Sequence, residues 1–325
     1  MKSLVLTGEK TLVLEEVDAR LPGPGETALR VECCALCRTD AKMWEKGQRD
    51  LVLPRVLGHE ICGLEESTGA RFVVWPGRAC GTCPECTSGY ENLCPHMRIL
   101  GFNRDGGLAD QVLVPREALI PIKDDIPAPT AALAEPLACC LNALNQVRAG
   151  AGERILVFGA GPVGLLAGMA ALSRGAVPVL VEKNPEKLSR SAEFCRATGI
   201  KAHTNLGSGS FDICINAASA VETFSAGIER LRPRGRFVLF SGFPGKETLC
   251  AQALNEIHYR QLLVAGAYGC TRADMVEAVG ILDLHRDSVG LIIERSISLE
   301  EVPLVMARIA GGQALKIAVI PGRSG

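Results

Sequence analysis

The chain has 325 residues, 47% hydrophobic and 22% charged, which leaves room for two domains with substantial apolar cores. Lysine and arginine number 35 and aspartate and glutamate 36, so the net charge of −1 argues against nucleic acid or a membrane surface as a partner held by bulk electrostatics. The 14 cysteines, without a signal peptide or an apolar run that could span a membrane, favour a cytoplasmic protein whose thiols serve as metal ligands.

The N-terminal part of the chain predicts a β-rich domain. Residues 1 to about 30 alternate between apolar and polar side chains, which is typical of short antiparallel strands. A turn rich in proline and glycine at 21–26 precedes a strand over Thr27 to Val31. Farther on, a glycine turn at 105–109 leads into another alternating run, which we expect to be a strand of the same domain.

Two short segments of this domain carry residues suited to catalytic zinc. Cys37-Arg38-Thr39-Asp40 follows the first strands, and Gly58-His59-Glu60 comes later. Cysteine and histidine are ligands that catalytic zinc uses, and a carboxylate such as Asp40 is well suited to orient an imidazole. A lone His59 would be interpreted as a hydrogen-bonded core or surface histidine, but it does not stand alone.

The segment at about 78–96 predicts a small metal-binding lobe. Cys80, Cys83, Cys86 and Cys94 have the spacing at which several thiolates can converge on one ion. Tetrahedral zinc closed by four thiolates suits this pattern, and such a closed site is structural. Two disulfides would need an oxidising compartment, for which the sequence has no signal, and an iron–sulfur cluster would use the same ligands.

An apolar, alanine-rich helix is expected over Ala131 to Leu144, after the boundary at Pro127-Ala128-Pro129. It carries one acid near its start, Glu135. This carboxylate either favours the helix N-terminus or serves as a metal ligand.

From residue 153 the pattern becomes that of an α/β domain. A buried strand over Arg154 to Phe158, a helix over Leu165 to Ser173 and a strand over Pro178 to Val181 flank a glycine turn. This is the setting of a dinucleotide fingerprint. The turn, which would bind the cofactor's pyrophosphate at the helix N-terminus, consists of Gly159, Ala160, Gly161, Pro162, Val163 and Gly164.

The acid after the second strand predicts the choice of cofactor. Glu182 can accept hydrogen bonds from both ribose hydroxyls and would repel a 2′-phosphate, which favours NAD over NADP. Lys183, beside it, weakens that preference. The alternation then continues, with strands expected at 211–216, 235–240 and 262–266 and a helix at 221–231. The tail predicts helices at 273–284 and 299–310 and a strand at 314–320.

Together these segments resemble the zinc-dependent medium-chain alcohol dehydrogenases, within them the polyol (sorbitol-type) and threonine dehydrogenase branch. The matching motifs, in order, are 37–40, 58–60, the four-cysteine lobe, 105–109, 135–138 and 159–164. The resemblance implies an α/β protein with a Rossmann doubly wound parallel sheet that binds NAD, at 138–269. It also implies a β-rich GroES-like catalytic domain at 1–137, with the structural zinc lobe, to which 270–325 returns.

The resemblance also implies the roles of single residues. The catalytic zinc would be bound by Cys37, His59 and Glu135. A second, structural zinc would be bound by the four lobe cysteines, giving two zinc ions per chain. Cys139 and Cys140 are alternative ligands to Glu135.

Further implied roles concern the residues around this zinc. Glu60 would lie near the zinc and could approach it, and Asp40 would hydrogen-bond His59. Thr39 would accept the substrate proton, and Arg38 would contact the phosphates of the cofactor.

The chain departs from the family pattern at a few positions. Lys42 stands where the family usually has a histidine that continues the proton relay. Trp44 is typical of the polyol branch and is expected to line the substrate pocket. The segment 64–74 is shorter than usual, which affects the expected local barrel geometry rather than the ligands.

The sequence thus predicts a zinc-dependent enzyme that transfers hydride between a secondary alcohol, of polyol, sugar-like or amino-alcohol type, and NAD. L-threonine 3-dehydrogenase is an alternative of the same class, and a non-catalytic NAD-binding redox sensor is an alternative of another class. The expected partner is a small-molecule alcohol, and the resemblance implies a homo-oligomer, either dimer or tetramer.

Overall fold

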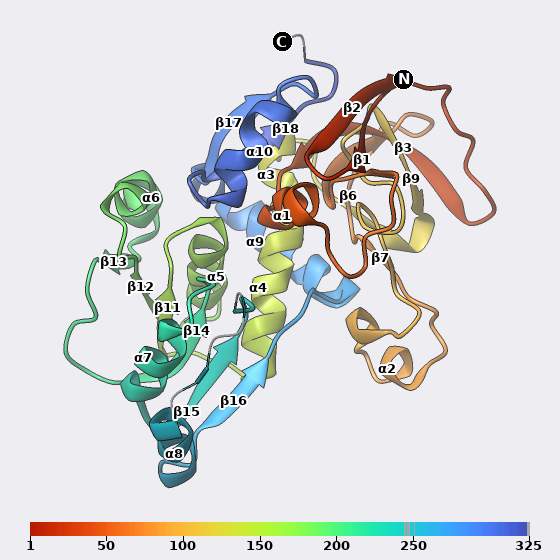
Figure 1. The fold of residues 1–325 in the computed structure, drawn as a ribbon. Coiled ribbons are helices and arrows are strands. Elements are labelled where there is room, and N and C mark those ends of the chain that lie inside the picture. The colour runs from red at the N-terminus through yellow and green to blue at the C-terminus, as the bar shows by residue number, and fades with distance from the viewer. Residues whose placement is uncertain (244, 246–247, 250, 324–325) are drawn as a thin grey trace. The chain divides into compact units, whose positions relative to one another are not determined.

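The computed structural model describes residues 1–243, 245, 248–249 and 251–323. Contacts divide the chain into two compact units. Unit 1 consists of Met1–Pro136 and Cys270–Gly325, and unit 2 is the continuous segment Leu137–Gly269. Unit 1 is therefore built from both ends of the chain. In Figure 1 the colour runs from red at the N-terminus to blue at the C-terminus, so unit 1 combines the two ends of the colour bar.

Unit 1 is rich in β-structure. Its strands are β1 (Lys2–Gly8), β2 (Thr11–Glu16), β3 (Glu26–Ala35), β4 (Arg55–Val56), β5 (Glu60–Glu65), β6 (Ala70–Val74), β7 (Gly77–Arg78), β8 (Arg98–Ile99), β9 (Gln111–Pro115), β10 (Leu119–Pro121), β17 (Ile293–Ile297) and β18 (Lys316–Val319). The largest sheet has the order β10-β6-β5-β3-β18-β17, with β9 also pairing with β3. Smaller sheets are formed by β2-β1-β4 and by β7-β8. The C-terminal stretch thus adds two strands to a sheet that the N-terminal stretch begins.

The helices of unit 1 are mostly short. They are α1 (Arg38–Lys46), α2 (Pro84–Thr87), α3 (Ala128–Ala131), α9 (Arg272–Gly290) and α10 (Val302–Ala310), with 3₁₀ turns η1 (Glu91–Leu93) and η2 (Arg116–Ala118). Helix α1 packs against α10. The apolar core of the unit joins buried side chains from the strands and from α10, such as Leu29, Leu57 and Met306.

Unit 2 has a six-stranded parallel sheet. Its strands are β11 (Arg154–Phe158), β12 (Val177–Val181), β13 (Lys201–His203), β14 (Phe211–Asn216), β15 (Leu231–Leu239) and β16 (Leu263–Gly266), and its helices are α5 (Pro162–Ser173), α6 (Pro185–Thr198), α7 (Glu222–Arg230) and α8 (Ala251–Tyr259). The order β13-β12-β11-β14-β15-β16, with every neighbouring pair parallel, is that of the doubly wound dinucleotide-binding fold. The predicted fold class is confirmed.

The predicted elements of unit 2 agree with the structure where the signals are local. Strands β11 and β14 have the predicted bounds. Helix α5 begins at Pro162, earlier than predicted, because proline is favoured in the first turn of a helix. The single helix predicted over Ala131 to Leu144 is divided between α3 and α4 (Ala134–Gln146).

Helix α6 was not predicted, although its sequence carries the usual boundary signals. Asn184 caps its start, with the side chain accepting hydrogen bonds from the backbone N–H groups of Glu186 and Lys187. Pro185 occupies the first turn, and Gly199 ends the helix with a left-handed φ of 72°. The helix could therefore have been found from these caps.

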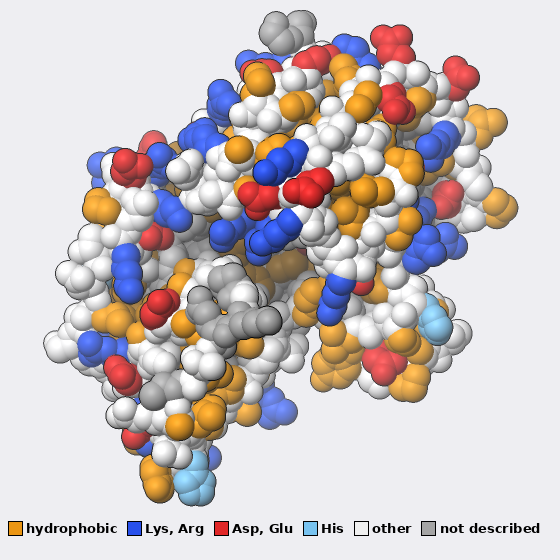
Figure 2. All heavy atoms as spheres, viewed as in Figure 1, with side chains coloured by type: hydrophobic (Ala, Val, Ile, Leu, Met, Phe, Trp, Pro, Cys, Tyr) orange, Lys and Arg blue, Asp and Glu red, His pale blue; other side chains and the backbone are white. Residues whose placement is uncertain are grey.

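No helix in the described part of the chain has the length and apolar character needed to cross a bilayer. On the face shown in Figure 2, basic and acidic side chains are interspersed, in agreement with the net charge of −1.

Candidate active site

Helix α1 positions the first group of candidate residues. Cys37 is its N-cap, and its Sγ accepts a hydrogen bond from the backbone N–H of Thr39 at 3.4 Å. Asp40 completes a capping box, because its Oδ2 accepts a hydrogen bond from the Cys37 N–H at 2.9 Å. The thiol and the carboxylate are therefore held by the start of one helix.

Asp40 also contacts the histidine of the site. Its side chain is fully buried, Oδ1 accepts a hydrogen bond from the Gly58 N–H at 3.2 Å, and His59 Nδ1 lies 3.3 Å from the same oxygen without the alignment of a good hydrogen bond. With Nδ1 facing Asp40, Nε2 is the ring nitrogen left to bind a ligand. The ring of Phe102 packs against the imidazole, with centroids 5.4 Å apart.

The surroundings of His59 are strongly negative. Burial acts to lower the pKa of His59, but the carboxylate of Asp40 and the thiol of Cys37 outweigh it and raise this pKa well above its ordinary value. The pKa of Asp40 is lowered, since the interaction with His59 and the two backbone hydrogen bonds overcome the effect of burial. Such an environment attracts a cation.

Cys37, His59 and Glu60 come together as a possible metal site. Each offers one ligand atom, and these atoms all lie within 4.8 Å of one another. One sulfur, one nitrogen and one carboxylate oxygen form a donor set of the kind that catalytic zinc uses. Oε2 of the fully buried Glu60 has no hydrogen-bond partner, so a cation would satisfy it. The residues present therefore fit zinc.

Several neighbouring charges affect the pKa of Glu60. Burial raises its pKa to about 7, Lys316 opposes this shift, and Glu135 adds to it. Glu135 therefore lies near enough to influence Glu60. Its carboxylate is grouped with the thiols of Cys139 and Cys270, however, and not with Cys37, His59 and Glu60. The sequence favoured Glu135 as the third ligand, whereas in the structure it is Glu60 whose carboxylate is grouped with Cys37 and His59.

Lys316 is a residue of this site that the sequence did not predict. It is 3% exposed, and its ammonium group forms an ion pair with Oε1 of Glu60 and donates a hydrogen bond to the carbonyl of Leu36 at 3.3 Å. A buried lysine in an otherwise apolar strand was the available signal, because lysine is almost never fully buried without a partner.

The remaining predicted residues of α1 lie around this group. Thr39 is half-buried, and Arg38 is exposed with its Nε donating to the carbonyl of Ala310 at 3.2 Å. Lys42 is half-buried, and burial followed by the charge of Arg38 lowers its pKa. Trp44 packs against the core of unit 1, and its role in a substrate pocket stays a prediction.

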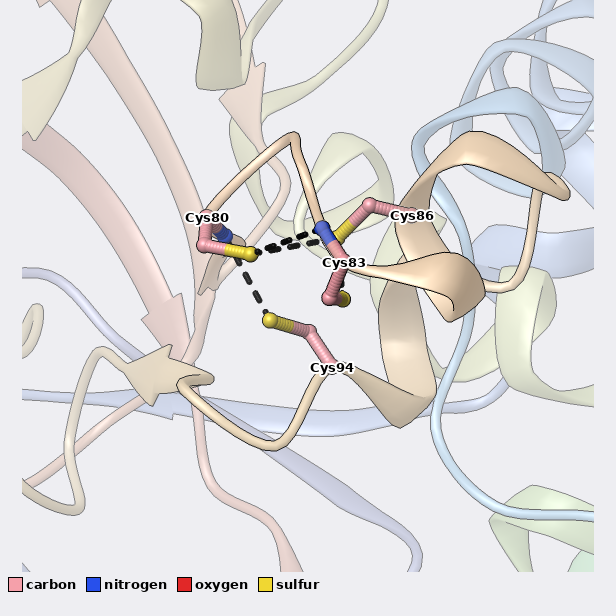
Figure 3. A group of neighbouring side chains, drawn as sticks. All are labelled: Cys80, Cys83, Cys86 and Cys94. Carbon is pink, nitrogen blue, oxygen red and sulfur yellow. Dashed lines mark hydrogen bonds between the residues drawn. The ribbon is translucent and has the colours of Figure 1, made fainter.

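The four lobe cysteines form a second group whose sulfurs all lie within 4.8 Å of one another (Figure 3). The sulfur of Cys86 is 3.3 Å from that of Cys83 and 4.0 Å from that of Cys80. Tetrahedral zinc, with Zn–S bonds of about 2.3 Å, separates its sulfurs by roughly 3.8 Å. No disulfide joins cysteines among the described residues, and the spacing of the four sulfurs fits one zinc ion.

Hydrogen bonds prepare one of these thiols for a metal. The backbone and hydroxyl of Thr82 and the backbone N–H of Cys83 donate to Cys80 and lower its pKa to about 5. Cys80 is therefore a thiolate at neutral pH, which is the form that binds zinc.

The glycine turn of unit 2 has the geometry of a phosphate-binding loop. Gly159 has a φ of +109°, which favours glycine, and a Cβ on Gly164 would lie 2.0 Å from the Gly159 carbonyl oxygen. A Cβ on Gly161, in contrast, would meet nothing within 4 Å. The space beside Gly161, at the start of α5, is therefore open, as the close approach of a pyrophosphate requires.

Glu182 is tied to this turn. Its Oε2 accepts a hydrogen bond from the Ala160 N–H at 3.1 Å, and its Oε1 accepts one from the Asn184 N–H at 2.9 Å. The carboxylate is thus placed beside the glycines at the end of β12, where the ribose of a dinucleotide is expected. Lys183 is exposed.

Comparisons with known proteins show similarity to zinc-binding dehydrogenases over most of the chain. The family model of the alcohol dehydrogenase GroES-like domain matches residues 23–124, and that of the zinc-binding dehydrogenases matches residues 162–283. D-altritol 5-dehydrogenase of Agrobacterium fabrum is 30% identical over 306 residues, which cover 89% of this chain and 90% of the relative. L-threonine 3-dehydrogenase of Pyrococcus furiosus is 30% identical over 280 residues, 79% of each chain. A crystal structure of a zinc-binding dehydrogenase from Sinorhizobium meliloti bound to NADP has a TM-score of 0.87 and 29% identity, and covers 98% of this chain and 99% of that one.

Proposed function

This chain belongs to the zinc-dependent medium-chain alcohol dehydrogenases, and we propose that it oxidises a secondary alcohol group of a polyol or sugar-like substrate with NAD as hydride acceptor. It is an oxidoreductase that uses zinc and a nicotinamide dinucleotide and acts on a small-molecule alcohol. The observation that carries the proposal is the convergence of Cys37, His59 and Glu60, with Asp40 behind the imidazole. The similarity to a polyol dehydrogenase supports the substrate class.

The residues of the site divide the chemistry among them. Cys37 and His59 would hold zinc with a carboxylate from Glu60 or Glu135, and when bound, zinc supplies Lewis-acid chemistry that favours loss of a proton from an alcohol. Asp40, 3.3 Å from Nδ1 of His59, would orient the ring so that Nε2 is available to the metal. Thr39, half-buried two residues after Cys37, would accept the substrate proton.

The cofactor residues support a preference for NAD. The open space at Gly161 and the N-terminus of α5 would receive the pyrophosphate. Glu182 would accept hydrogen bonds from the ribose hydroxyls and repel the 2′-phosphate of NADP. Since the relative from Sinorhizobium meliloti was solved with NADP, both cofactors need to be measured.

L-threonine 3-dehydrogenase is the second candidate function, because a relative of that activity is 30% identical over 79% of the chain. The alternative of a non-catalytic redox sensor gains no support from the dehydrogenase matches. A homo-oligomeric state, dimer or tetramer, stays a prediction of the resemblance, and a cytoplasmic location stays a prediction from the composition of the chain.

The decisive test combines metal content with activity. We expect two zinc ions per chain, and reduction of NAD with one class among polyols, secondary alcohols, sugars and threonine. Cys37→Ser should remove one zinc and lower kcat on the order of 10³-fold, since the metal contributes several kcal/mol to the transition state, while NADH binding persists.

Cys195→Ser is the matched control, because this half-buried thiol of α6 belongs to none of the groups that could hold a metal. It should keep both zinc ions and full turnover. Preserved turnover in Cys37→Ser would overturn the proposed function.

A further inference from the structure

The buried ion pair between Lys316 and Glu60 needs an explanation. Both side chains are at most 4% exposed, and an ammonium group and a carboxylate are costly to bury unless each is compensated. The partners come from strands that lie far apart in the sequence. A buried ion pair is often less stabilising than well-packed apolar side chains in the same place. Its presence here therefore suggests a function other than stability.

The register of the sheet of unit 1 explains how the two residues meet. Strand β3 lies between β5 and β18, and its Ala35 is paired with Glu60 on one side and with Ala318 on the other. Lys316 precedes Ala318 by two residues, so its side chain lies on the same face of the sheet. The small side chain of Ala35 leaves room for the lysine to reach across β3 to Glu60.

The contacts of Lys316 leave one carboxylate oxygen of Glu60 without a partner. Its ammonium engages Oε1 of Glu60, while Oε2 is buried without a hydrogen-bond partner. The same ammonium donates to the carbonyl of Leu36, the residue directly before Cys37. Lys316 therefore contacts both segments that carry these three ligands, one at Glu60 and the other at the residue before Cys37.

We propose that Lys316 is a positioning residue of the metal centre: it holds Oε1 of Glu60, so that Oε2 is presented to the metal beside Cys37 and His59. This inference rests on the proposed function, in which Cys37 and His59 bind zinc. It predicts that the lysine acts on metal affinity through Glu60. Residues that orient metal ligands typically change metal affinity or activity by about 10–100-fold when they are replaced.

The test is a double-mutant cycle in which metal affinity is measured by competition with a chelator. Lys316→Met should weaken binding of the zinc at Cys37 and His59 by about 10–100-fold and shift the visible spectrum of the cobalt-substituted enzyme. Lys316→Arg, which keeps a cation able to reach the carboxylate, should bind close to wild type. The zinc of the four-cysteine lobe is an internal control and should stay bound in every variant.

The Glu60→Gln background decides whether the lysine acts through Glu60. There, adding Lys316→Met should change metal affinity little, since the carboxylate it positions is gone. In the double mutant neither side chain carries a charge, so this comparison can still be made if Lys316→Met alone does not fold. Wild-type affinity in Lys316→Met, or equal weakening in both backgrounds, would overturn the inference. Only one zinc in the wild type would instead overturn the proposed function and remove the premise.

Discussion

Glu65, at the end of β5, shows how one buried carboxylate is stabilised by its neighbours. Its side chain is 7% exposed. It accepts hydrogen bonds from the hydroxyls of Thr27 and Thr68 at 2.7 and 2.9 Å, and Arg116 lies 3.2 Å away. The two hydroxyls, followed by Arg116, lower the pKa of Glu65 below its ordinary value of 4.5. Folding therefore favours the ionised form of this residue.

This shift predicts a pH dependence of stability. A folded-state pKa below the unfolded value means that the stabilisation is present above about pH 4.5 and is lost as the pH falls through the folded pKa. Glu65→Gln should therefore lower the free energy of unfolding by about 1–3 kcal/mol at neutral pH, and the difference from wild type should shrink in acid. Urea unfolding at several pH values measures both.

Glu66→Gln is the control for this experiment. Glu66 is 68% exposed and pairs with Arg30 at 3.4 Å, an arrangement that contributes little to stability. If the difference in the free energy of unfolding between Glu65→Gln and wild type stayed constant down to acid pH, the lowered pKa of Glu65 would be contradicted.

Single residues differ in how far the sequence alone can place them. Cys37 and His59 are recognisable from residue type and spacing, since few other roles need that combination. Lys316 is separated from Glu60 by 256 positions, and only the pairing of β18 with β3 and of β3 with β5 brings them together. No local pattern could rank Glu60 above Glu135 as a ligand, because their distances to Cys37 depend on where β5 and α4 lie.

At the scale of elements, the β11–α5–β12 segment owes its cofactor site to two glycines with different tasks. A Cβ on Gly164 would collide with the Gly159 carbonyl, whereas one on Gly161 would point into open space. Gly164 is thus needed for packing of the turn, and Gly161 is needed only when a phosphate approaches.

Two alanine substitutions separate these tasks. Gly164→Ala should lower stability by about 1–3 kcal/mol, because the turn must shift to relieve the overlap, and NADH binding should weaken with it. Gly161→Ala should leave the melting temperature close to wild type and still weaken NADH binding by about tenfold or more, since the methyl occupies the place of the pyrophosphate. Thermal melting and fluorescence titration with NADH measure the two effects.

The pair is its own control. If Gly161→Ala bound NADH as well as the wild type did, the assignment of this turn to the cofactor would be wrong. If Gly164→Ala were as stable as the wild type, the turn would be more adaptable than its geometry indicates.

Elements are predictable where their signals lie within the segment itself. The strand, glycine turn and strand of the dinucleotide fingerprint are such a case, since the apolar runs and the glycines are contiguous. Strand β17 was not predicted, because its half-buried residues show no clear alternation and it is defined by its pairing with β18. Helix α1 was also not predicted, and its start depends on the capping contacts of Cys37 and Asp40.

At the scale of the whole molecule, the two cofactor types are assigned to different units. The group of Cys37, His59 and Glu60 and the group of four lobe cysteines consist of residues of unit 1, and the glycine turn with Glu182 belongs to unit 2. Each unit also has an apolar core of its own. Zinc and NAD should therefore stabilise different parts of the chain.

The sequence offers a probe for this division. The chain has two tryptophans, Trp44 and Trp75, and both lie in unit 1. Tryptophan fluorescence therefore follows unit 1, while calorimetry follows both units. We expect a chelator to lower the midpoint temperature of thermal unfolding measured by fluorescence, because metal binding contributes folding free energy to its site.

We expect NAD, in contrast, to leave unchanged the midpoint temperature of unfolding that fluorescence reports for the chelated protein. NAD should raise the midpoint temperature of a separate calorimetric transition. At a concentration of about 100 times its Kd, a ligand adds about 2.7 kcal/mol to the unit that binds it, which corresponds to roughly 10 °C for a domain of this size. A single transition that zinc and NAD moved equally would show that the units unfold as one, since linkage then distributes each ligand's binding energy over the whole chain.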